Sequence, residues 1–332
     1  MKDNTIKVAV IDCGFYSIKN YLNNSKNLDV YFININREED RKVLSKCDII
    51  IPTMAKIDKN ILDIAKNIKL IQQWGAGLDG VNIEEATRRG IAVANVDSKS
   101  TYNAESVAEW CIMAAISLGR GYPKIHKNVL KGGPWGHPIG ESLIGKTVGI
   151  VGFGGIGRAL AKRLNAFSVN IVAVKRTPQA HLENQYNLRW LKGIEYLDDL
   201  LRISKFIFLC LPLNDETKNL IDKKRIANIP KDSYLINASR GDIIEKEAFI
   251  EALKNKHIKS AALDVFWEEP TDPRDPILGF DNLLLTPHIA GVTDISYEHI
   301  SEKVLENIKK IMNKEVPVNC VNIEYKKYSN YR

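Results

Sequence analysis

The chain has 332 residues, 45% of them hydrophobic and 26% charged, which is ordinary for a soluble globular protein and sufficient for two domains with separate cores. No apolar run approaches the length of a membrane span, and an apolar strand begins almost at the N-terminus, so we expect neither a membrane segment nor a signal peptide. The formal net charge of +7 is spread along the chain without a basic block interleaved with aromatics, which disfavours a nucleic-acid partner and indicates a surface that attracts small anions.

Cysteine usage indicates the compartment. The chain has five cysteines, an odd number at wide spacings with no C-x-x-C pair. Cys13, Cys111 and Cys210 lie in apolar runs, where a free cysteine behaves as a small hydrophobic residue. We therefore expect a reducing, cytoplasmic location, no disulfide framework, and no zinc or other metal site.

The N-terminal part of the chain alternates between short apolar runs and helical patterns. Alternation of this kind is typical of an α/β fold with a parallel sheet covered on both faces. No G-x-G-x-x-G follows the first strand, so we expect a flavodoxin-like layer without a dinucleotide loop of its own. Strands are predicted at 7–13, 30–35, 48–52, 70–74 and 91–96, and helical segments at 18–22, 61–65 and 83–89.

A long helical stretch at 103–131 is predicted to connect two domains, and an irregular arm at 132–138 follows it. An amphipathic helix at 293–313 is followed by Pro317, which ends it. The polar, tyrosine-rich tail at 324–332 is expected to be loosely held. Between the arm and the last helix, strands are predicted at 147–151, 169–174, 206–211, 234–238, 261–266 and 283–286.

The segment at 147–158 has the order strand, glycine-rich turn, helix, and Gly152, Gly154 and Gly157 in it form G-x-G-x-x-G. The first glycine permits a tight turn, the second lets a pyrophosphate approach the backbone, and the third lets helix and strand pack closely. The N–H groups at the start of the helix favour phosphate binding. We therefore predict a dinucleotide site here, which also includes Phe153, Gly155 and Ile156.

The end of the second strand of such a unit discriminates NAD from NADP. An NAD site usually has an acidic residue there, which accepts hydrogen bonds from the ribose hydroxyls. Here Lys175, Arg176 and Thr177 follow the strand, and two cations with a hydroxyl suit a 2′-phosphate dianion. We favour NADP. The alternative is NAD held by its phosphates, with the cations as a solvated pair.

Polar side chains follow the last three predicted strands: Arg240, Glu269 and His288. Because ligands bind at the carboxyl edge of an open α/β sheet, these residues can converge. A guanidinium binds a carboxylate or polarises a carbonyl oxygen, an imidazole exchanges a proton near neutral pH, and a carboxylate can hold that imidazole in one tautomer. Either Arg240 or His288 alone would more often be structural, but together they predict chemistry on a 2-hydroxy acid. Spacing alone does not decide between Glu268 and Glu269.

Several motifs, in order, resemble those of the D-isomer-specific 2-hydroxyacid dehydrogenases over nearly the full length of the chain. The resemblance implies two Rossmann-like domains with parallel sheets and an active site in the cleft, with a substrate-binding domain at 1–101 and 290–332 and a dinucleotide-binding domain at 102–289. The motifs are Gly75-Ala76-Gly77-Leu78-Asp79, Asn103-Ala104-Glu105-Ser106-Val107-Ala108-Glu109, the Gly152 fingerprint, Asn237-Ala238-Ser239-Arg240-Gly241-Asp242, Ala262-Leu263-Asp264-Val265-Phe266 with Glu269-Pro270, and Pro287-His288-Ile289-Ala290-Gly291.

The resemblance implies that Arg240, Glu269 and His288 are catalytic, with Glu269 favoured over Glu268, and that Arg240 and His288 also contact substrate and cofactor. It implies that the amides of Ala76 and Gly77 bind the substrate carboxylate, although that loop could also simply turn the chain. It further implies a homodimer through the cofactor domains, to which the arm around Trp135 contributes. Other cofactor contacts are expected at Asp264, beside the nicotinamide, and at Leu211, Pro212, Ala238, Ser239, Ala290 and Gly291.

The leading interpretation is reduction of a small 2-oxo acid, such as glyoxylate or hydroxypyruvate, to the D-2-hydroxy acid. A 3-phosphoglycerate dehydrogenase is the second enzymatic interpretation, and formate dehydrogenase is disfavoured because that branch replaces the glutamate. A dinucleotide-sensing binding protein, like the corepressor relatives of the family, is the alternative from another class. Trp74 and Trp267 either border the substrate pocket or pack in a core.

Overall fold

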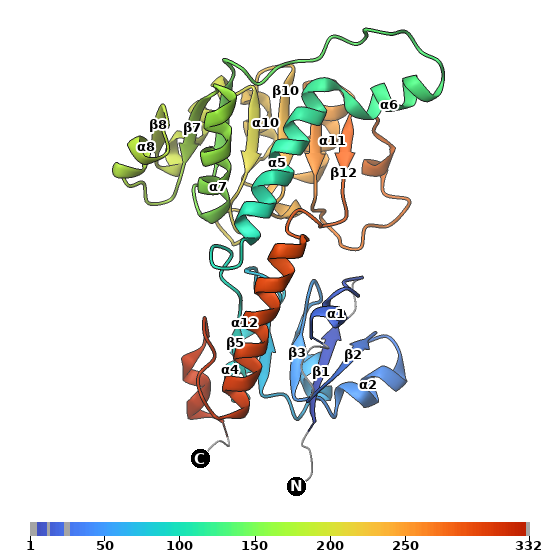
Figure 1. Ribbon diagram of the computed structural model, residues 1–332, viewed down its shortest axis with the longest axis vertical. Coiled ribbons are helices and arrows are strands. Elements are labelled where there is room, and N and C mark those ends of the chain that lie inside the picture. The colour runs from blue at the N-terminus through green and yellow to red at the C-terminus, as the bar shows by residue number, and fades with distance from the viewer. Residues whose placement is uncertain (1–4, 12–13, 23–26, 330–332) are drawn as a thin grey trace. The chain divides into compact units, whose positions relative to one another are not determined.

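The computed structural model describes residues 5–11, 14–22 and 27–329, which form two compact units (Figure 1). Unit 1 is Met1–Tyr102 with Asp294–Arg332, and unit 2 is Asn103–Thr293. Unit 1 thus ends at 102 where 101 was predicted, and it resumes at 294 where 290 was predicted. Residues 12 and 13, the predicted end of the first strand, lie outside the described residues.

Unit 1 is built on a parallel sheet of five strands in the order β2-β1-β3-β4-β5. This is the flavodoxin-like order, which confirms the predicted layer. The sheet is covered on both faces, because alternate residues of one strand enter different cores: Val8 and Val10 lie in one, Ala9 and Ile11 in the other. The strands are β1 (Ile6–Ile11), β2 (Leu28–Ile33), β3 (Ile49–Ile51), β4 (Leu70–Gln72) and β5 (Ala92–Ala94).

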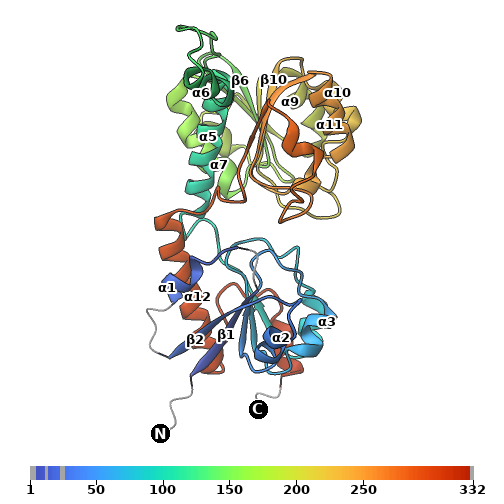
Figure 2. The ribbon, with the colours of Figure 1, turned by 90° about the vertical axis from the view of Figure 1, so that its right-hand side faces the viewer.

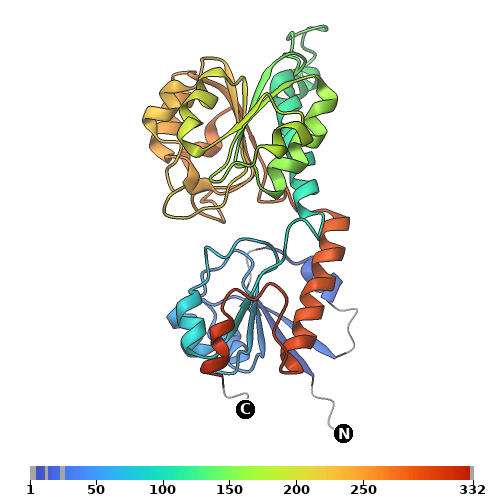
Figure 3. The ribbon, with the colours of Figure 1, turned by 90° about the vertical axis from the view of Figure 1, so that its left-hand side faces the viewer.

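The last helix of the chain belongs to this unit. Ile300, Val304 and Ile308 recur at helical spacing and pack into the same core as Val8 and Val10. Figures 2 and 3 show α12 on one face of the sheet and α2 and α3 on the other. The sequence analysis missed α2, because only one of its residues is buried. The helices of unit 1 are α1 (Ile18–Leu22), α2 (Glu38–Leu44), α3 (Lys59–Ile64), α4 (Ile83–Arg88) and α12 (Asp294–Met312).

The expectation that the tail is loosely held was wrong for its described part. A 3₁₀ helix, η5 (Ile323–Lys327), carries Tyr325 into the core of unit 1, where it is 3% exposed. The preceding Asn322 accepts a hydrogen bond from the Val93 N–H at 2.7 Å and donates to the Ile91 carbonyl at 3.0 Å. The Asn322 amide thus bonds backbone groups at the edge strand β5, and Tyr325 fills part of the core. Together they hold the segment in place.

Unit 2 is built on a parallel sheet of seven strands in the order β12-β11-β10-β9-β6-β7-β8. The strand order reverses between β6 and β9, which is the topological switch point at which such sheets bind nucleotides. This confirms the predicted Rossmann-like fold, although β8 was not predicted. The strands are β6 (Thr147–Val151), β7 (Asn170–Val174), β8 (Trp190–Lys192), β9 (Phe206–Leu209), β10 (Ser233–Asn237), β11 (Ile258–Leu263) and β12 (Leu283–Leu285).

Helices cover both faces of this sheet, with α5 and α7 in one core and α9, α10 and α11 in the other. Four short 3₁₀ helices connect elements: η1 (Asn165–Phe167), η2 (Ile194–Tyr196), η3 (Gly241–Ile243) and η4 (Pro276–Gly279). The α-helices of unit 2 are α5 (Asn103–Arg120), α6 (Tyr122–Leu130), α7 (Gly155–Leu164), α8 (His181–Gln185), α9 (Leu197–Ile203), α10 (Lys223–Asn228) and α11 (Lys246–Lys254).

The single helical stretch predicted at 103–131 is broken into α5 and α6. Gly121 adopts a left-handed conformation with φ of 67°, which ends the first helix and turns the second away from its axis (Figure 1). A residue without a Cβ adopts this conformation at little cost. The first helix is also not a free connector, because it packs against α7 and β10 within unit 2.

Within the described ranges, no helix is long and apolar enough to cross a membrane. The cysteines Cys47, Cys111, Cys210 and Cys320 are free, and Cys13 lies outside the described residues. In the part of the chain that the structure describes, no cluster of histidine, cysteine and acidic side chains could hold a metal ion.

Glu141 joins several strands at the amino edge of the sheet in unit 2. Its carboxylate, 19% exposed, accepts hydrogen bonds from Tyr234 at 3.1 Å and Lys259 at 3.2 Å, and pairs with Lys205 at 3.1 Å. Burial acts to raise the pKa of Glu141, but these hydrogen bonds hold it below its ordinary value. A carboxylate with a lowered pKa stabilises the folded state above its unfolded pKa, and that stability is lost as the pH falls through the folded pKa.

We therefore expect Glu141→Gln to reduce the free energy of unfolding at pH 7 by about 1–2 kcal/mol, since the partner lysines are partly solvated. The difference from the native chain should shrink as the pH falls below about 4.5, the ordinary pKa of the side chain. Urea denaturation at several pH values measures it. Glu302→Gln, at an exposed position in α12, is the control and should show no such trend. A pH-independent loss of stability would contradict the electrostatic explanation.

Candidate active site

The glycine-rich turn after β6 has the conformation that a dinucleotide requires. Gly152 has φ of 97°, and a Cβ there would lie 2.5 Å from the Cys210 carbonyl oxygen. A Cβ on Gly157 would overlap the Gly152 carbonyl oxygen, whereas Gly154 has open space beside it. No side chain caps the start of α7. A pyrophosphate site needs a tight turn, a close contact of the helix with the strand, and open access to uncapped N–H groups. The turn has all three, so these residues fit a dinucleotide.

The predicted cofactor residues Leu211 and Pro212 lie beside this turn, and Ala238 and Ser239 follow the next strand but one. The Leu211 side chain is 2.9 Å from the position of a Cβ on Gly152, and Pro212 follows it directly. Ala238 and Ser239 follow β10, whose partner β9 lies beside β6. Phe153 is fully buried in the core under α7, so its side chain packs there and only its backbone can contact a ligand.

The end of β7 is cationic. Lys175 follows the strand directly, and burial together with the charge of Arg158 lowers the pKa of its ammonium group. Its Nζ donates to the Gln179 side chain at 3.2 Å, while Arg176 and Thr177 are exposed. The buried Arg158 Nε has no hydrogen-bond partner. Among the described residues, none of these three cations has a carboxylate partner.

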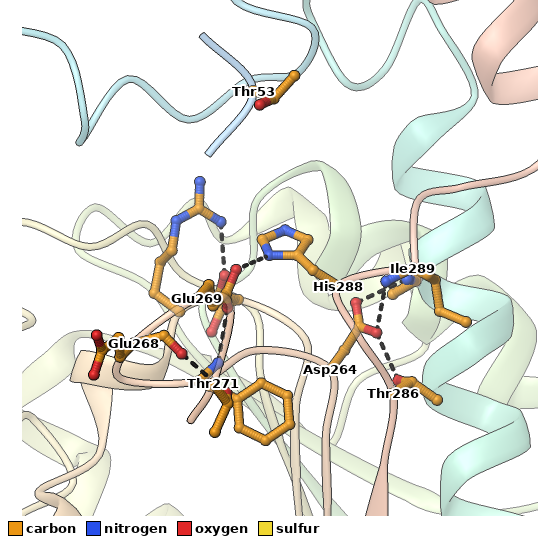
Figure 4. Close-up of polar contacts among 12 residues, drawn as sticks. Thr53, Asp264, Glu268, Glu269, Thr271, Thr286, His288 and Ile289 are labelled. Atoms are coloured by element: carbon orange, nitrogen blue, oxygen red, sulfur yellow. Dashed lines mark hydrogen bonds and ion pairs between the residues drawn. The ribbon is translucent and has the colours of Figure 1, made fainter. Parts of the chain in front are cut away.

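Arg240, Glu269 and His288 follow β10, β11 and β12, which are neighbours at one end of the sheet. The Nδ1 atom of His288 lies 2.7 Å from Oε2 of Glu269, and the other carboxylate oxygen accepts a hydrogen bond from the Phe266 N–H at 2.8 Å. Figure 4 shows the Glu268 carboxylate directed away from the histidine. Glu269 is therefore the partner of His288, which the spacing of the two glutamates did not decide.

Asp264 holds the turn that carries the histidine. The carboxylate is 1% exposed and accepts hydrogen bonds from Thr286 Oγ1 at 2.6 Å, the Ile289 N–H at 2.8 Å and the Ala290 N–H at 2.7 Å (Figure 4). Burial raises the pKa of Asp264 despite these donors. His288 itself has φ of 55° and donates its N–H to the Asp264 carbonyl. Both carboxylate oxygens are thus used within the chain, and contact with a nicotinamide stays a prediction.

Asn237 shapes the loop that presents Arg240. Its side chain donates to the Arg240 carbonyl at 2.8 Å and accepts from the Ser239 N–H at 3.0 Å. Arg240 Nη1 donates to the Ser239 carbonyl at 2.7 Å. A Cβ on Gly241 would overlap the backbone of Phe266, so this loop packs tightly against the loop that leads to Glu269. Asn237 and Gly241 lie inside the quoted motif, but their supporting roles were not recognised from sequence.

The predicted carboxylate-binding residues lie in unit 1. Ala76 and Gly77 are in the loop after β4, and the N–H groups of residues 75–78 donate to no atom of the described residues. Consecutive N–H groups that have no partner within the chain can bind an anion, and binding of the substrate carboxylate here stays a prediction. We call residues 75–78 the amide nest.

The two tryptophans left open by the sequence have packing roles. Trp74 is 6% exposed and meets Tyr297 edge-on, with ring centroids 5.5 Å apart. Trp267 donates its indole N–H to the Ile244 carbonyl at 2.7 Å and lies beside Phe249. Trp135, by contrast, is 93% exposed.

Comparison with known proteins identifies the family. A family model described as the NAD-binding domain of D-isomer-specific 2-hydroxyacid dehydrogenases matches residues 112–290. A glyoxylate reductase from Thermofilum pendens is 36% identical over 81% of this chain and 79% of its own length. A D-3-phosphoglycerate dehydrogenase from Methanocaldococcus jannaschii is 33% identical over 87% of this chain but only 54% of its own.

A solved structure shares the fold over nearly the whole chain. The D-lactate dehydrogenase from Aquifex aeolicus, complexed with NAD and lactic acid, has a TM-score of 0.82 and 25% identity, covering 95% of this chain and 99% of that one. Together with the family model and the curated relatives, it confirms the resemblance seen in the motifs. This chain belongs to the D-isomer-specific 2-hydroxyacid dehydrogenase family and is an oxidoreductase.

Proposed function

We propose that the protein reduces a small 2-oxo acid of the glyoxylate or hydroxypyruvate class to the D-2-hydroxy acid, with NADPH favoured over NADH. The hydrogen-bonded pair of His288 and Glu269, presented beside Arg240 at the carboxyl edge of the sheet, carries this proposal. A relative named glyoxylate reductase at 36% identity supports the substrate class.

The nicotinamide cofactor supplies the hydride when bound, and the chain's own side chains prepare the substrate for it. The amide nest binds the substrate carboxylate. The guanidinium of Arg240 polarises the keto oxygen, and its fixed charge stabilises the negative charge that develops there. Because Nδ1 of His288 is engaged by Glu269, Nε2 is the ring nitrogen that gives its proton to that oxygen. Glu269 keeps the ring oriented and pairs with the imidazolium.

Cations at the end of β7 support the preference for NADP. Lys175 and Arg176 stand where an NAD site usually has an acidic residue, and Thr177 adds a hydroxyl. The charge of Arg158 acts on Lys175, so a third cation contributes to the same potential. A 2′-phosphate dianion would relieve this repulsion, whereas the ribose hydroxyls of NAD would not.

We expect Arg176→Ala to raise KM for NADPH by about 10- to 100-fold, since a lost charge-assisted hydrogen bond costs about 1.5–3 kcal/mol. KM for NADH should change little, because NADH has no 2′-phosphate to bind. Steady-state kinetics with both cofactors measures the difference. Arg189→Ala removes an exposed arginine that precedes β8, at the amino end of the strands, whereas Arg176 lies at their carboxyl end, and it serves as the control. Equal effects of Arg176→Ala on both cofactors would remove the NADP assignment.

Turnover of a panel of 2-oxo acids with both cofactors tests the proposed function. Glyoxylate and hydroxypyruvate should be reduced fastest, and 3-phosphohydroxypyruvate slowly. The relative named D-3-phosphoglycerate dehydrogenase is matched over only 54% of its length, so we rank that activity second. If the dinucleotide binds while no acid is reduced, the protein is instead a dinucleotide-sensing binding protein of the corepressor type.

We also propose that two copies associate through the cofactor-binding unit. The helices α5 and α6 and the segment 131–146 that follows them expose a series of large apolar side chains, which is unusual for a monomer surface. A second copy would cover them. Sedimentation velocity should therefore give twice the chain mass of 37.4 kDa. The exposed residues are Met113, Tyr122, Val129, Leu130, Trp135, Ile139 and Ile144, each at least 43% exposed.

A further inference from the structure

In the amide nest of unit 1, the backbone carbonyl oxygens are hydrogen-bonded within the part of the chain that the structure describes, and the backbone N–H groups are not. The N–H groups of residues 75–78 donate to no described residue, whereas every carbonyl oxygen of the same four residues accepts a hydrogen bond. Backbone N–H groups bond the outer carbonyls: Val96 N–H donates to Gly75 at 3.0 Å, and Val81 N–H to Leu78 at 2.9 Å.

Two side-chain amides bond the inner carbonyls. Asn95 Nδ2 donates to the Ala76 carbonyl at 2.7 Å, and Gln73 Nε2 donates to the Gly77 carbonyl at 2.8 Å. The peptide unit of the Ala76 carbonyl carries the Gly77 N–H, which is assigned to the substrate carboxylate, and that of the Gly77 carbonyl carries the neighbouring Leu78 N–H. A carbonyl oxygen turned toward that carboxylate would repel it, so the direction of these two peptides decides whether the loop attracts or rejects an anion.

Both polar atoms of the Gln73 side chain, Nε2 and Oε1, make hydrogen bonds. Its Nε2 also donates to the Thr53 carbonyl at 3.0 Å, and its Oε1 accepts from the Trp74 N–H at 2.9 Å. It thereby ties the loop after β3 to the loop after β4. Asn95 follows β5, so the side-chain amides brace the nest from two different strands.

We propose that Gln73 and Asn95 are positioning residues that keep the amide nest polarised toward a carboxylate, and thereby set the preference for 2-oxo acids over neutral carbonyl compounds. The inference rests on the proposed function. Both residues act through the backbone of residues 76 and 77 and supply no charge of their own. A glutamine and an asparagine suit this task because their NH₂ groups donate hydrogen bonds to carbonyl oxygens without adding a charge. Glutamate and aspartate have the same side-chain length but no such donor.

The variants Gln73→Glu and Asn95→Asp keep side-chain size and remove the donors. Each should raise KM for glyoxylate by about 10- to 100-fold, because the peptides lose their orientation and a negative charge is added next to the substrate. KM for the dinucleotide should stay within about threefold, since that site lies in unit 2. Asn67→Asp is the matched control: Asn67 donates in the same way to the Ser45 carbonyl in unit 1, but at an exposed site outside the nest.

A substrate without a carboxylate tests whether the variants lose carboxylate binding alone or have a general structural defect. Methylglyoxal has a reducible carbonyl and no carboxylate, so the ratio of kcat/KM for glyoxylate to that for methylglyoxal should fall by about tenfold or more in both nest variants. A variant that is merely unfolded would lose both activities in proportion, and thermal denaturation reports it directly. Binding of oxalate to the protein with NADP⁺ should weaken in parallel with KM.

Two failures are distinguishable. If the native chain reduces no 2-oxo acid, the proposed function fails. If the native chain reduces glyoxylate while both variants keep its KM and its preference over methylglyoxal, the role assigned to Gln73 and Asn95 is overturned and the proposed function stands.

Discussion

Replacement of His288 by asparagine should lower kcat for glyoxylate reduction by about 10²- to 10⁴-fold, the usual contribution of a positioned general acid. Asparagine is the appropriate substitution because His288 has φ of 55°, and asparagine tolerates this left-handed conformation better than most residues. Its amide does not exchange a proton near neutral pH. Stopped-flow or steady-state assays at saturating substrate and saturating dinucleotide measure the loss.

The partner Glu269 provides a second arm for this experiment. Glu269→Gln should also lower kcat, and the double variant should be little worse than His288→Asn alone, because the two side chains act as one unit through their 2.7 Å contact. His257→Asn is the matched control, since His257 is partly buried and hydrogen-bonds the Ile226 carbonyl elsewhere in unit 2. Additive losses in the double variant would show that the two residues act separately.

Replacement of Arg240 by lysine should lower kcat/KM for glyoxylate by about 10²- to 10³-fold although the positive charge is kept. A guanidinium presents several N–H donors in a rigid plane, whereas an ammonium group is a single point charge on a flexible chain. Arg240 also donates to the Ser239 carbonyl at 2.7 Å, and this bond fixes the direction of its plane. Steady-state kinetics over a range of glyoxylate concentrations should show a higher KM together with a lower kcat, because the side chain contacts the substrate before and during reduction.

Arg202→Lys is the control for this substitution. Arg202 lies in α9, is half exposed, and pairs only with Asp199 among the described residues. Near-native activity of Arg240→Lys would mean that charge alone suffices at this position, and would favour simple electrostatic attraction over polarisation by a fixed guanidinium.

Much of the fold could be predicted because its causes are local. The glycine spacing at 152–157 requires one backbone conformation, and the structure has it. Apolar runs of β-branched residues predicted most strands, and the recurrence of Ile300, Val304 and Ile308 predicted the last helix. Errors occurred where a single backbone angle or a distant partner decides the outcome. Gly121 breaks a continuous helical pattern, and the tail is ordered by contacts with β5 and the core of unit 1.

In the candidate site, too, the features with local causes could be predicted from the sequence. Sequence motifs predicted that a guanidinium, an imidazole and a carboxylate would follow three strands, since the residue types and strand ends are visible in the chain itself. The motifs also identified the family.

The sequence by itself determined the fold class, the family and the residue types available for catalysis, because periodicity and motif spacing act over a few neighbouring residues. The family resemblance favoured Glu269 over Glu268, but only the tertiary structure shows that its carboxylate meets His288. Only the tertiary structure shows that Asp264 braces the turn of His288 and that Gln73 and Asn95 bond the carbonyls of the amide nest. Except for the bond from Gln73 to Gly77, which lies within the loop after β4, each of these depends on a hydrogen bond between loops that follow different strands. Such bonds depend on where the loops cross after the sheet has formed, and no local pattern in the chain specifies that.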